Sequence, residues 1–454
     1  MKDFLFDDFN EVSAKEWKQR IQYDLKGADY NDTVVWQSPE GIHVKPFYHQ
    51  DDFEGEFSPI PGQPKTWSIA QDVFVDDAVI ANSLAVDALN RGAETIIFKA
   101  EKPFELKQLF NKFPFSNNSL IFDFSFLDEE FLSRLNGYLI DNKANFRIQL
   151  DPIGQLLKTG NWFANQKSDM AAVETVLKTD TTALSVNVAT VQNAGASIVQ
   201  QLAYALAHAN EYLNLFAEKN PKIKLTFTFA TGSNYFFEIA KLRAFRKLYA
   251  ALAREYNVEQ TCTIVAVPTF RNKTLYDYNV NMLRTTTECM SAVLGGADVV
   301  CNLAYDAVFH KSNEFGERIS RNQLLILKEE SYFDIVSNPT DGTYYIERLT
   351  NDLADKALVI FKDIEKGGGF LQQLHDGAIQ KKIKESAAKE QEQFDNGTLK
   401  LLGTNFHKNA HDRMKHDLEL FPFLKKNPVK TLIEPVIPRR LAEKMEQERL
   451  NEES

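Results

Sequence analysis

The sequence has little cysteine and lacks the patterns that mark membrane, nucleic-acid-binding and disulfide-rich proteins. Its three cysteines, Cys262, Cys289 and Cys301, form no C-x-x-C pair among 454 residues. An odd count without paired spacing does not indicate a disulfide framework, so we expect a reducing, cytoplasmic setting. No apolar run approaches the roughly 20 residues that span a bilayer. The net charge of −11 argues against a phosphate-binding surface, so no membrane and no nucleic acid is expected as a partner.

The sequence also lacks the spacing of a metal site or a phosphate loop. None of the eight histidines forms H-x-x-H or H-E-x-x-H, although His407 and His411 could share a helix face. Gly295-Gly296 and the glycines at 367–369 are explained as helix ends, because glycine is preferred just after a helix. From residue chemistry alone we find no nucleophile–base pair and expect no metal.

From residue 71 onward, short apolar runs alternate with long helical stretches. The run 225–229, LTFTF, is followed by a polar turn and by apolar residues at helical spacing, which together predict one β/α unit. This alternation predicts a parallel sheet with helices outside, and eight units are typical of a closed (β/α)8 TIM barrel of the α/β class. The alternative is a doubly wound open sheet, but its glycine-rich fingerprint is missing after the first predicted strand. The predicted strands are 95–99, 120–124, 146–150, 184–188, 225–229, 263–267, 298–303 and 333–336.

The helix after 225–229 carries Arg243, Arg246 and Lys247 at i, i+3 and i+4. This basic stripe could contact a phosphate. A solvated outer face is the favoured interpretation, because the helices of a barrel have an outside.

Two segments flank the predicted barrel, which we assign to residues 71–370. Residues 1–70 form an N-terminal arm with Trp17 and Trp36 but no periodic core of its own, so we expect it to pack on this chain or on a partner. Within the arm, Ser13 and Glu16 have the spacing of a capping box and predict a short helix. Residues 371–454 form a charged, helical C-terminal extension.

Several motifs, in order along nearly the whole chain, resemble the acyl-CoA-binding barrel of adenosylcobalamin-dependent methylmalonyl-CoA mutases. They include FEIAKLRAFRKLYAAL, IEKGGGF and IEPVIPRRLAE, and EGIHVKPFY resembles the N-terminal arm of that family. The resemblance implies a (β/α)8 barrel and a radical rearrangement of methylmalonyl-CoA to succinyl-CoA. The motifs cover 191–213, 237–252, 283–300, 318–331, 338–358, 364–370 and 433–443.

The catalytic positions implied by this resemblance are degenerate. Thr190 stands where the family has a histidine for the thioester carbonyl, and Thr159 stands where it has an arginine for the substrate carboxylate. The tyrosine-bearing loop is shortened to 61–66, and no tyrosine occurs between Tyr48 and Tyr138. Leu303 and Ala307 replace an asparagine and a glutamate that contact the adenosyl group.

The cofactor and substrate positions are degenerate as well. No histidine has an aspartate two residues before it, so the D-x-H motif of a flavodoxin-like cobalamin domain is absent and no such domain is expected. Lys224 and Thr226 fall where the family has an arginine and a serine near the coenzyme A. With Gln149 they are weak substrate-binding candidates.

The resemblance and the departures together predict the small, non-catalytic subunit of a two-chain methylmalonyl-CoA mutase. We expect its partner in a heterodimer to be a large catalytic subunit that binds adenosylcobalamin, so that this chain is part of an isomerase and is inactive alone. One alternative is the barrel half of a split acyl-CoA mutase with its cobalamin domain on another chain. Another is a CoA-binding regulatory barrel.

Overall fold

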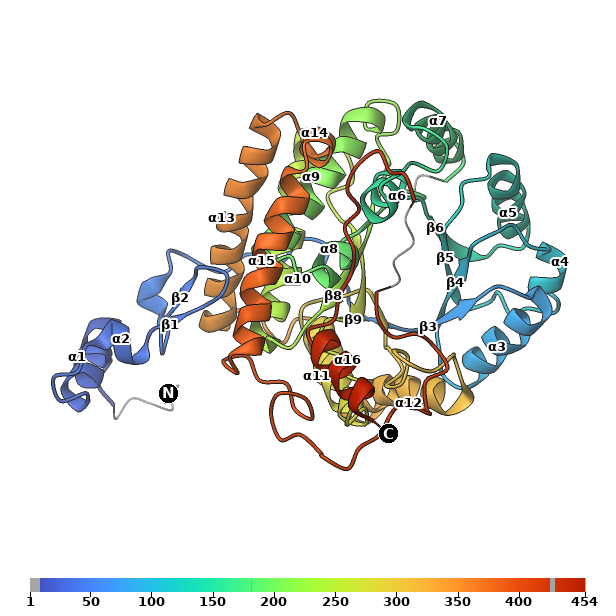
Figure 1. Ribbon diagram of the computed structural model, residues 1–454. Coiled ribbons are helices and arrows are strands. Elements are labelled where there is room, and N and C mark those ends of the chain that lie inside the picture. Colours follow the sequence, from blue (N-terminus) through green and yellow to red (C-terminus); the bar gives the residue numbers. More distant parts are fainter. Residues whose placement is uncertain (1–8, 181, 425–428, 454) are drawn as a thin grey trace.

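The computed structural model describes residues 9–180, 182–424 and 429–453, and its centre is an eight-stranded parallel barrel (Figure 1). The strands pair in the order β6-β5-β4-β3-β10-β9-β8-β7. Leu150 N donates to Ala183 O at 2.9 Å and Ser185 N donates to Leu150 O at 3.1 Å, which joins the two ends of this sheet. The strands are β3(Ser68–Phe74), β4(Thr95–Ala100), β5(Ser119–Phe124), β6(Asn145–Gln149), β7(Ser185–Asn187), β8(Thr226–Thr231), β9(Thr263–Pro268) and β10(Val299–Cys301).

The predicted fold class is confirmed, but one predicted strand is wrong. Residues 333–336 form a turn, and the missing strand is β3, which begins at Ser68, before the expected start of the barrel at residue 71. Gln71 and Asp72 interrupt the apolar pattern of β3, because Asp72 faces the polar mouth of the barrel. The run 225–229 therefore belongs to the sixth strand of the barrel and not to the fifth.

Helices surround the barrel, and a second helical layer covers part of them. The helix α10 packs on β8 and is itself covered by α9 and α13 (Figure 1). Within the described residues, no helix is apolar over enough length to cross a bilayer. The barrel helices are α3(Ala78–Asn90), α4(Leu106–Leu109), α5(Glu129–Asp141), α6(Pro152–Thr159), α7(Gln166–Leu177), α8(Ala189–Asn193), α9(Ile198–Phe216), α10(Tyr235–Glu255), α11(Val280–Leu294) and α12(Glu314–Leu325), and α13(Tyr344–Lys366) belongs to the second layer.

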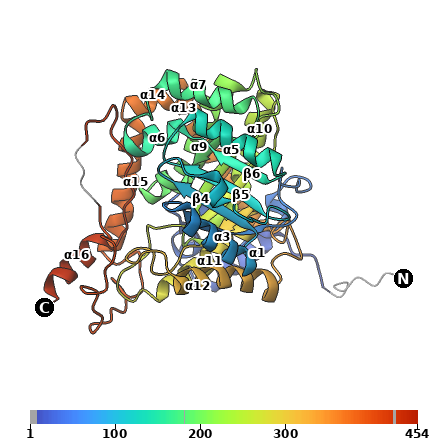
Figure 2. The same ribbon diagram turned by 90° about the vertical axis from the view of Figure 1, so that its right-hand side faces the viewer.

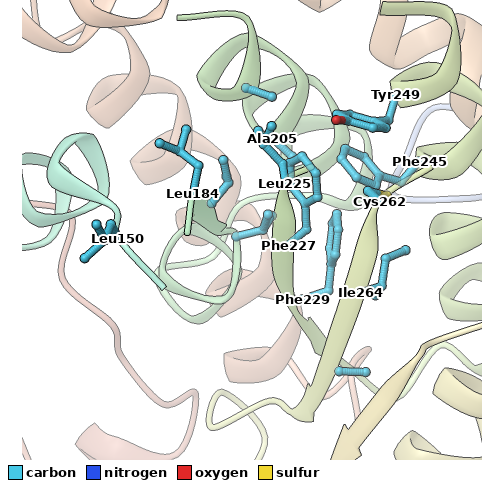
Figure 3. Packing of buried hydrophobic residues seen from close by; sticks show 14 of the residues in the cluster. Leu150, Leu184, Ala205, Leu225, Phe227, Phe229, Phe245, Tyr249, Cys262 and Ile264 are labelled. Atoms are coloured by element: carbon cyan, nitrogen blue, oxygen red, sulfur yellow. The ribbon is translucent and has the colours of Figure 1, made fainter. Parts of the chain in front are cut away.

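The outward face of β8 and the inner face of α10 form the densest aromatic packing of this unit. The rings of Phe227 and Phe245 lie 4.5 Å apart, and that of Phe229 lies 4.9 Å from Phe245, all in edge-to-face geometry (Figure 3). Tyr249 closes the group at 5.3 Å from Phe227. Such pairs add to the burial of apolar area, so they fix α10 on its strand.

Two of the three residues of the basic stripe of α10 are buried and the third, Lys247, is half-buried with its Nζ 2.7 Å from Asn351 Oδ1, so the interpretation of the stripe as a solvated face is wrong. Arg243 is 0% exposed and pairs with Asp341 and Glu347, while Arg246 is 1% exposed and lies 2.7 Å from Asp298. The prediction treated the outside of a barrel helix as solvent. Here α13 and the loop before it cover that outside, and a buried guanidinium requires such partners.

The interior of the barrel is filled by small and medium apolar side chains. They form a cluster of their own, separate from the large core between strands and helices. A filled axis is the usual state of a (β/α)8 barrel, in which inward side chains stack in layers. The cluster comprises Ala70, Ile97, Ile121, Val265, Val299 and Cys301, with Val267 packed against it.

The N-terminal arm stands apart from the barrel in Figure 1. Its first helix, α1(Ala14–Asp24), has the predicted capping box of Ser13 and Glu16 and contributes no buried residue. The arm is anchored to the barrel by Glu40, whose carboxylate accepts hydrogen bonds of 2.8 Å from the amides of Ile198 and Val199 at the N-terminus of α9. The remaining elements of the described arm are α2(Tyr30–Val34), β1(Trp36–Gln37), β2(His43–Val44) and a short 3-10 helix, Gln50–Asp52.

The C-terminal extension is only partly helical. Its helices are α14(Phe370–His375), α15(Ala378–Asp395) and α16(Glu443–Glu452), and the described residues between α15 and α16, 396–424 and 429–442, contain no helix. Figure 2 shows α15 and α16 along one edge of the molecule, with α3 and α5 turned toward the viewer. In the described part of this extension no second β/α sheet follows the barrel.

Candidate functional site

The carboxyl ends of the strands, where (β/α)8 proteins place their sites, divide into two sides. The pocket side is a cavity of about 280 Å³ lined by residues of β3 to β8 and by α6. The sealed side consists of the loops after β8 and β9 with the adjoining parts of α10 and α11. The polar residues that line the pocket include Lys99, Asp123, Gln149, Asp151, Lys158, Ser185, Asn187, Thr190 and Thr228.

One wall of the pocket is organised around Asp151, which follows β6 and caps α6. Its carboxylate accepts hydrogen bonds from Tyr212 Oη at 2.7 Å, from Gly154 N at 2.8 Å and from Asn187 N at 2.9 Å. His208 Nε2 lies 2.9 Å from the same carboxylate. Burial works against the charge, but His208 and these donors hold the pKa of Asp151 below its usual value. Asp151 is therefore a fixed, saturated anion.

The opposite wall carries a second ion pair and an unsaturated carboxyl group. Lys99 Nζ lies 2.7 Å from Asp72 Oδ2. Desolvation in the mouth works against the ammonium, but Asp72 outweighs it and the pKa of Lys99 is raised. Burial raises the pKa of Asp123 although Lys99 and Lys158 oppose the shift, and the Asp123 carboxyl accepts no hydrogen bond from the described chain.

On the sealed side, a buried lysine ties α10 to the end of β8. Lys241 is 0% exposed, and its Nζ donates to Ala230 O at 2.6 Å and to Gln201 Oε1 at 3.1 Å. It also forms an ion pair with Glu238, one helical turn earlier. Every proton of this ammonium therefore has an acceptor, and none is left for a ligand.

A second buried pair fills the space behind the loop after β9. Lys273 Nζ lies 2.7 Å and 3.0 Å from the two carboxylate oxygens of Glu288, and Asn272 Nδ2 donates to the same carboxylate at 2.7 Å. Both side chains are almost inaccessible to solvent. Burial lowers the pKa of Lys273 and raises that of Glu288, so desolvation opposes both charges and the pairing offsets it.

Residues 431–442, which we call the C-terminal strap, run from α6 to the sealed side. The red trace in Figure 1 follows this path from α6 past α15 toward α16. Leu432 N donates to Gly160 O at 2.9 Å, Arg439 N to Asn193 O at 2.9 Å and Leu441 N to Arg271 O at 2.9 Å. Arg271 also pairs with Glu390 of α15 and donates to Arg439 O at 3.0 Å. The strap and α15 are thus held on the loop after β9.

The structure brings two of the residues singled out from the sequence to the pocket. Gln149 and Thr190 line it. Thr159 is exposed at the end of α6, where its hydroxyl donates to Gln155 O at 2.9 Å. Lys224 and Thr226 lie at the amino end of β8, at the other end of the barrel. The remaining two, Leu303 and Ala307, lie in the loop after β10 and outside the pocket lining.

The sequence interpretation did not single out the charged groups of the pocket. Lys99 and Asp123 lie at the carboxyl ends of the predicted strands 95–99 and 120–124. Their position at these ends is the sequence feature that could have indicated them as pocket residues. Lys158 lies beside Thr159, the position to which the resemblance points, and carries no motif of its own. Asn187 lies in the predicted strand 184–188, three residues before Thr190.

An imidazole that faces the cavity would be needed for this chain to hold the cobalt of a cobalamin there, and no described histidine lines the pocket. His208 is 4% exposed and held against Asp151, and His310 lies 3.1 Å from Asp306 in the loop after β10. Neither lines the pocket. In the described ranges no group of three or more His, Cys, Asp or Glu side chains is placed to hold a metal ion.

Comparison with known proteins agrees with the motifs. Residues 140–443 match the family model described as methylmalonyl-CoA mutase. The methylmalonyl-CoA mutase small subunit of Porphyromonas gingivalis is 34% identical over 440 residues, which are 89% of this chain and 71% of that protein. The small subunit of Streptomyces virginiae is 34% identical over 258 residues, 54% of this chain and 41% of that protein. The large subunit of the same organism is 25% identical over 459 residues, 87% and 62% respectively.

Proposed function

The chain belongs to the methylmalonyl-CoA mutase family, and we propose that it is the small, catalytically silent subunit of a two-chain mutase of this kind. In this proposal the complex interconverts methylmalonyl-CoA and succinyl-CoA, and adenosylcobalamin is bound by the large subunit. The small subunit keeps the barrel and the surface that pairs with its partner, and its role is to stabilise or tune the large chain.

The observation that carries the proposal is the chemistry at the carboxyl end of the barrel. Thr190 stands in the pocket where the family resemblance implies a histidine, and Thr159 is turned to solvent with its hydroxyl bonded to the backbone. Donors aimed at developing charge supply several kcal/mol of transition-state stabilisation each. A mouth without them supports a structural role over that of an active barrel served by a separate cobalamin chain.

The filled interior supports the same proposal over a CoA-binding barrel. The cluster around Ile97, Ile121 and Val265 is 0–5% exposed and occupies the axis. A thioester chain lying along that axis would have to displace these side chains. Packed cores resist such insertion, which costs typically 1–3 kcal/mol for even a few added methylenes.

The exposed arm supports a partner chain. Trp17, Tyr23 and Val12 are 51%, 76% and 52% exposed, and α1 buries no residue against the barrel. Exposed aromatic side chains gathered on one projecting element are typical of a protein–protein contact. The matches to both subunits of the Streptomyces virginiae protein make a large mutase chain the occupant we propose.

The experiment is co-expression with a large mutase chain from the same source. We expect a 1:1 complex that converts methylmalonyl-CoA, and we expect this chain alone to neither convert it nor bind adenosylcobalamin. The double variant Trp17→Ala/Tyr23→Ala should weaken the complex. The melting temperature of the isolated variant chain should equal that of the unaltered chain. Turnover of any acyl-CoA by this chain mixed with a free cobalamin-binding protein would overturn the proposal.

A further inference from the structure

The pocket side carries polar side chains that no other part of the described chain satisfies. Ser185 is 4% exposed and lines the pocket with a hydroxyl that has no hydrogen-bond partner. The buried Oδ1 of Asn187 also has none. Buried polar groups in proteins are normally paired with protein or with an ordered small molecule. The pocket-lining side chains in this unpaired state include Asp123, Gln149, Lys158, Ser185, Asn187 and Thr190.

Two of these groups carry opposite charge and do not meet. Lys158 and Asp123 line the same cavity, yet they form no ion pair. They are close enough to sense each other, because Lys158 is among the charges that oppose the burial-driven rise in the pKa of Asp123. A positive and a negative group therefore face the cavity with the space of the pocket between them.

The other charges of the pocket are already neutralised. Lys99 is held 2.7 Å from Asp72, and Asp151 is held by Tyr212 and lies 2.9 Å from His208. A ligand would gain little by competing for them, since each already has its partner inside the protein. Among the described residues that line the cavity, Lys158 is the one cation without an ion-pair partner, and Asp123 is a carboxyl group without one; Glu101, at the exposed rim, is the other.

We propose that this pocket binds a small zwitterion, a molecule with an ammonium and a carboxylate on a short carbon skeleton. The carboxylate lies on Lys158 and the ammonium on Asp123. The amides of Gln149 and Asn187 and the hydroxyl of Ser185 complete the hydrogen bonds, and Phe124 and Phe163 of the lining contact the carbon skeleton. This binding site is independent of the proposed mutase role.

Ligands with a single charge satisfy only half of this site. A simple carboxylate would pair with Lys158 but would leave Asp123 desolvated without a counter-charge, and a simple amine would pair with Asp123 but would leave the exposed Lys158 without one. Leaving one buried charge unpaired costs more than the pair contributes. The geometry therefore discriminates by charge pattern, and the volume of about 280 Å³ limits the length of the skeleton.

The test is calorimetric titration of the full chain with probes that differ only in charge and length. Glycine, β-alanine, 4-aminobutyrate and 5-aminopentanoate vary the separation of the charges, and butyrate and n-butylamine each remove one. We expect one length to bind best, at least about tenfold more tightly than butyrate or n-butylamine. The proposal is overturned if the zwitterions and the single-charge probes bind with equal affinity. It is also overturned if no probe binds with a Kd below about 10 mM.

Two variants then assign the charges. Asp123→Asn should weaken the best zwitterion at least about tenfold and should not weaken butyrate, because the uncompensated charge is gone, and Lys158→Met should weaken both. Lys178→Met, at an exposed lysine outside the pocket, is the matched control and should change neither. Melting curves establish that each variant folds. If a variant does not fold, the comparison of zwitterions of different length on the unaltered chain still tests the proposal. An unchanged affinity in Asp123→Asn contradicts the assignment.

Discussion

The two sides of the barrel mouth differ in how their polar groups are satisfied. On the sealed side, Lys241 and Lys273 are almost fully buried, and each is held by a carboxylate and further acceptors. On the pocket side, Asp123, Lys158 and Asn187 face a cavity without protein partners. The two sides of this barrel mouth therefore differ in the fate of their polar groups. On the sealed side these groups pair with one another, and on the pocket side the residue types expected from the family are replaced while the cavity remains.

The difference has energetic consequences. Buried ion pairs contribute little net stability, but removing one partner strands the other charge and costs several kcal/mol. Unpaired groups in a cavity have no partner to strand. We therefore expect the sealed side to be sensitive to substitution and the pocket side to be tolerant.

The largest effect is expected for Lys273→Met, which leaves the Glu288 carboxylate buried without its counter-charge. The free energy of unfolding should fall by about 3–5 kcal/mol, measured by urea denaturation. The matched change on the pocket side, Lys158→Met, should stay within about 0.5 kcal/mol. Similar losses in the two variants would show that the two sides are not energetically different.

The next effect is expected for Gly195→Ala, where α15 meets the loop after α8. The new Cβ would lie 2.5 Å from Ala387 Cβ, at a backbone φ of +101°. The control is Gly377→Ala, which has a φ of +73° but no atom within 4 Å, so it carries the backbone cost alone. Gly195→Ala should lower stability by about 1–3 kcal/mol more than the control. Equal melting temperatures would mean that α15 is not closely docked.

A loss of similar size is expected for Arg271→Met, which removes the ion pair to Glu390 and the hydrogen bond to Arg439 O. Hydrogen bonds of charged groups contribute about 1.5–3 kcal/mol, and the loss should appear as faster proteolysis of the strap. Lys384→Met breaks the exposed pair with Glu434 and should cost at most about 1 kcal/mol. A strap cleaved at the same rate in both variants would contradict its attachment through Arg271.

The smallest effect is a pH dependence at the border between the two sides. Burial, followed by the nearby Asp72, raises the pKa of Glu317 from its ordinary 4.5 to about 7. The fold thus disfavours the charged form of Glu317. The resulting loss in the free energy of unfolding is absent below pH 4.5, grows between pH 4.5 and pH 7, and is constant above pH 7. Glu317→Gln should be more stable than the unaltered chain at pH 8 by about 1–2 kcal/mol, with no gain at pH 4. An equal gain at both values would exclude titration as the cause.

Much of the fold was predictable from the sequence, and the failures have physical reasons. Seven barrel strands are compact apolar runs and were predicted, whereas β3 was missed because Gln71 and Asp72 break its pattern. Residues 333–336 are apolar enough for a strand but form a turn after Tyr332, whose φ is +58°. Arg243 and Arg246 were placed in solvent because helical periodicity cannot show that a second layer, α13, covers the helix.

The site was predictable only where the family resemblance pointed. Gln149 and Thr190 were named from that resemblance and do line the pocket. The opposition of Asp123 and Lys158 was not predictable, because the two residues lie about 35 positions apart and come to the same cavity only when β5 and β6 pair and α6 packs behind them. Their roles, and those of Lys224 and Thr226, stay predictions.

Native-state hydrogen exchange, read amide by amide, tests directly whether the mouth has one fixed side and one side kept for a ligand. Amides of α11, beside Glu288, should exchange only through global unfolding, and those of α6, beside Lys158, should exchange through a smaller opening. The best-binding zwitterion should slow amide exchange in α6. Within α11, it should leave unchanged the order in which the amides exchange. Equal protection of both helices, with no response of α6 to the ligand, would contradict the division of the mouth.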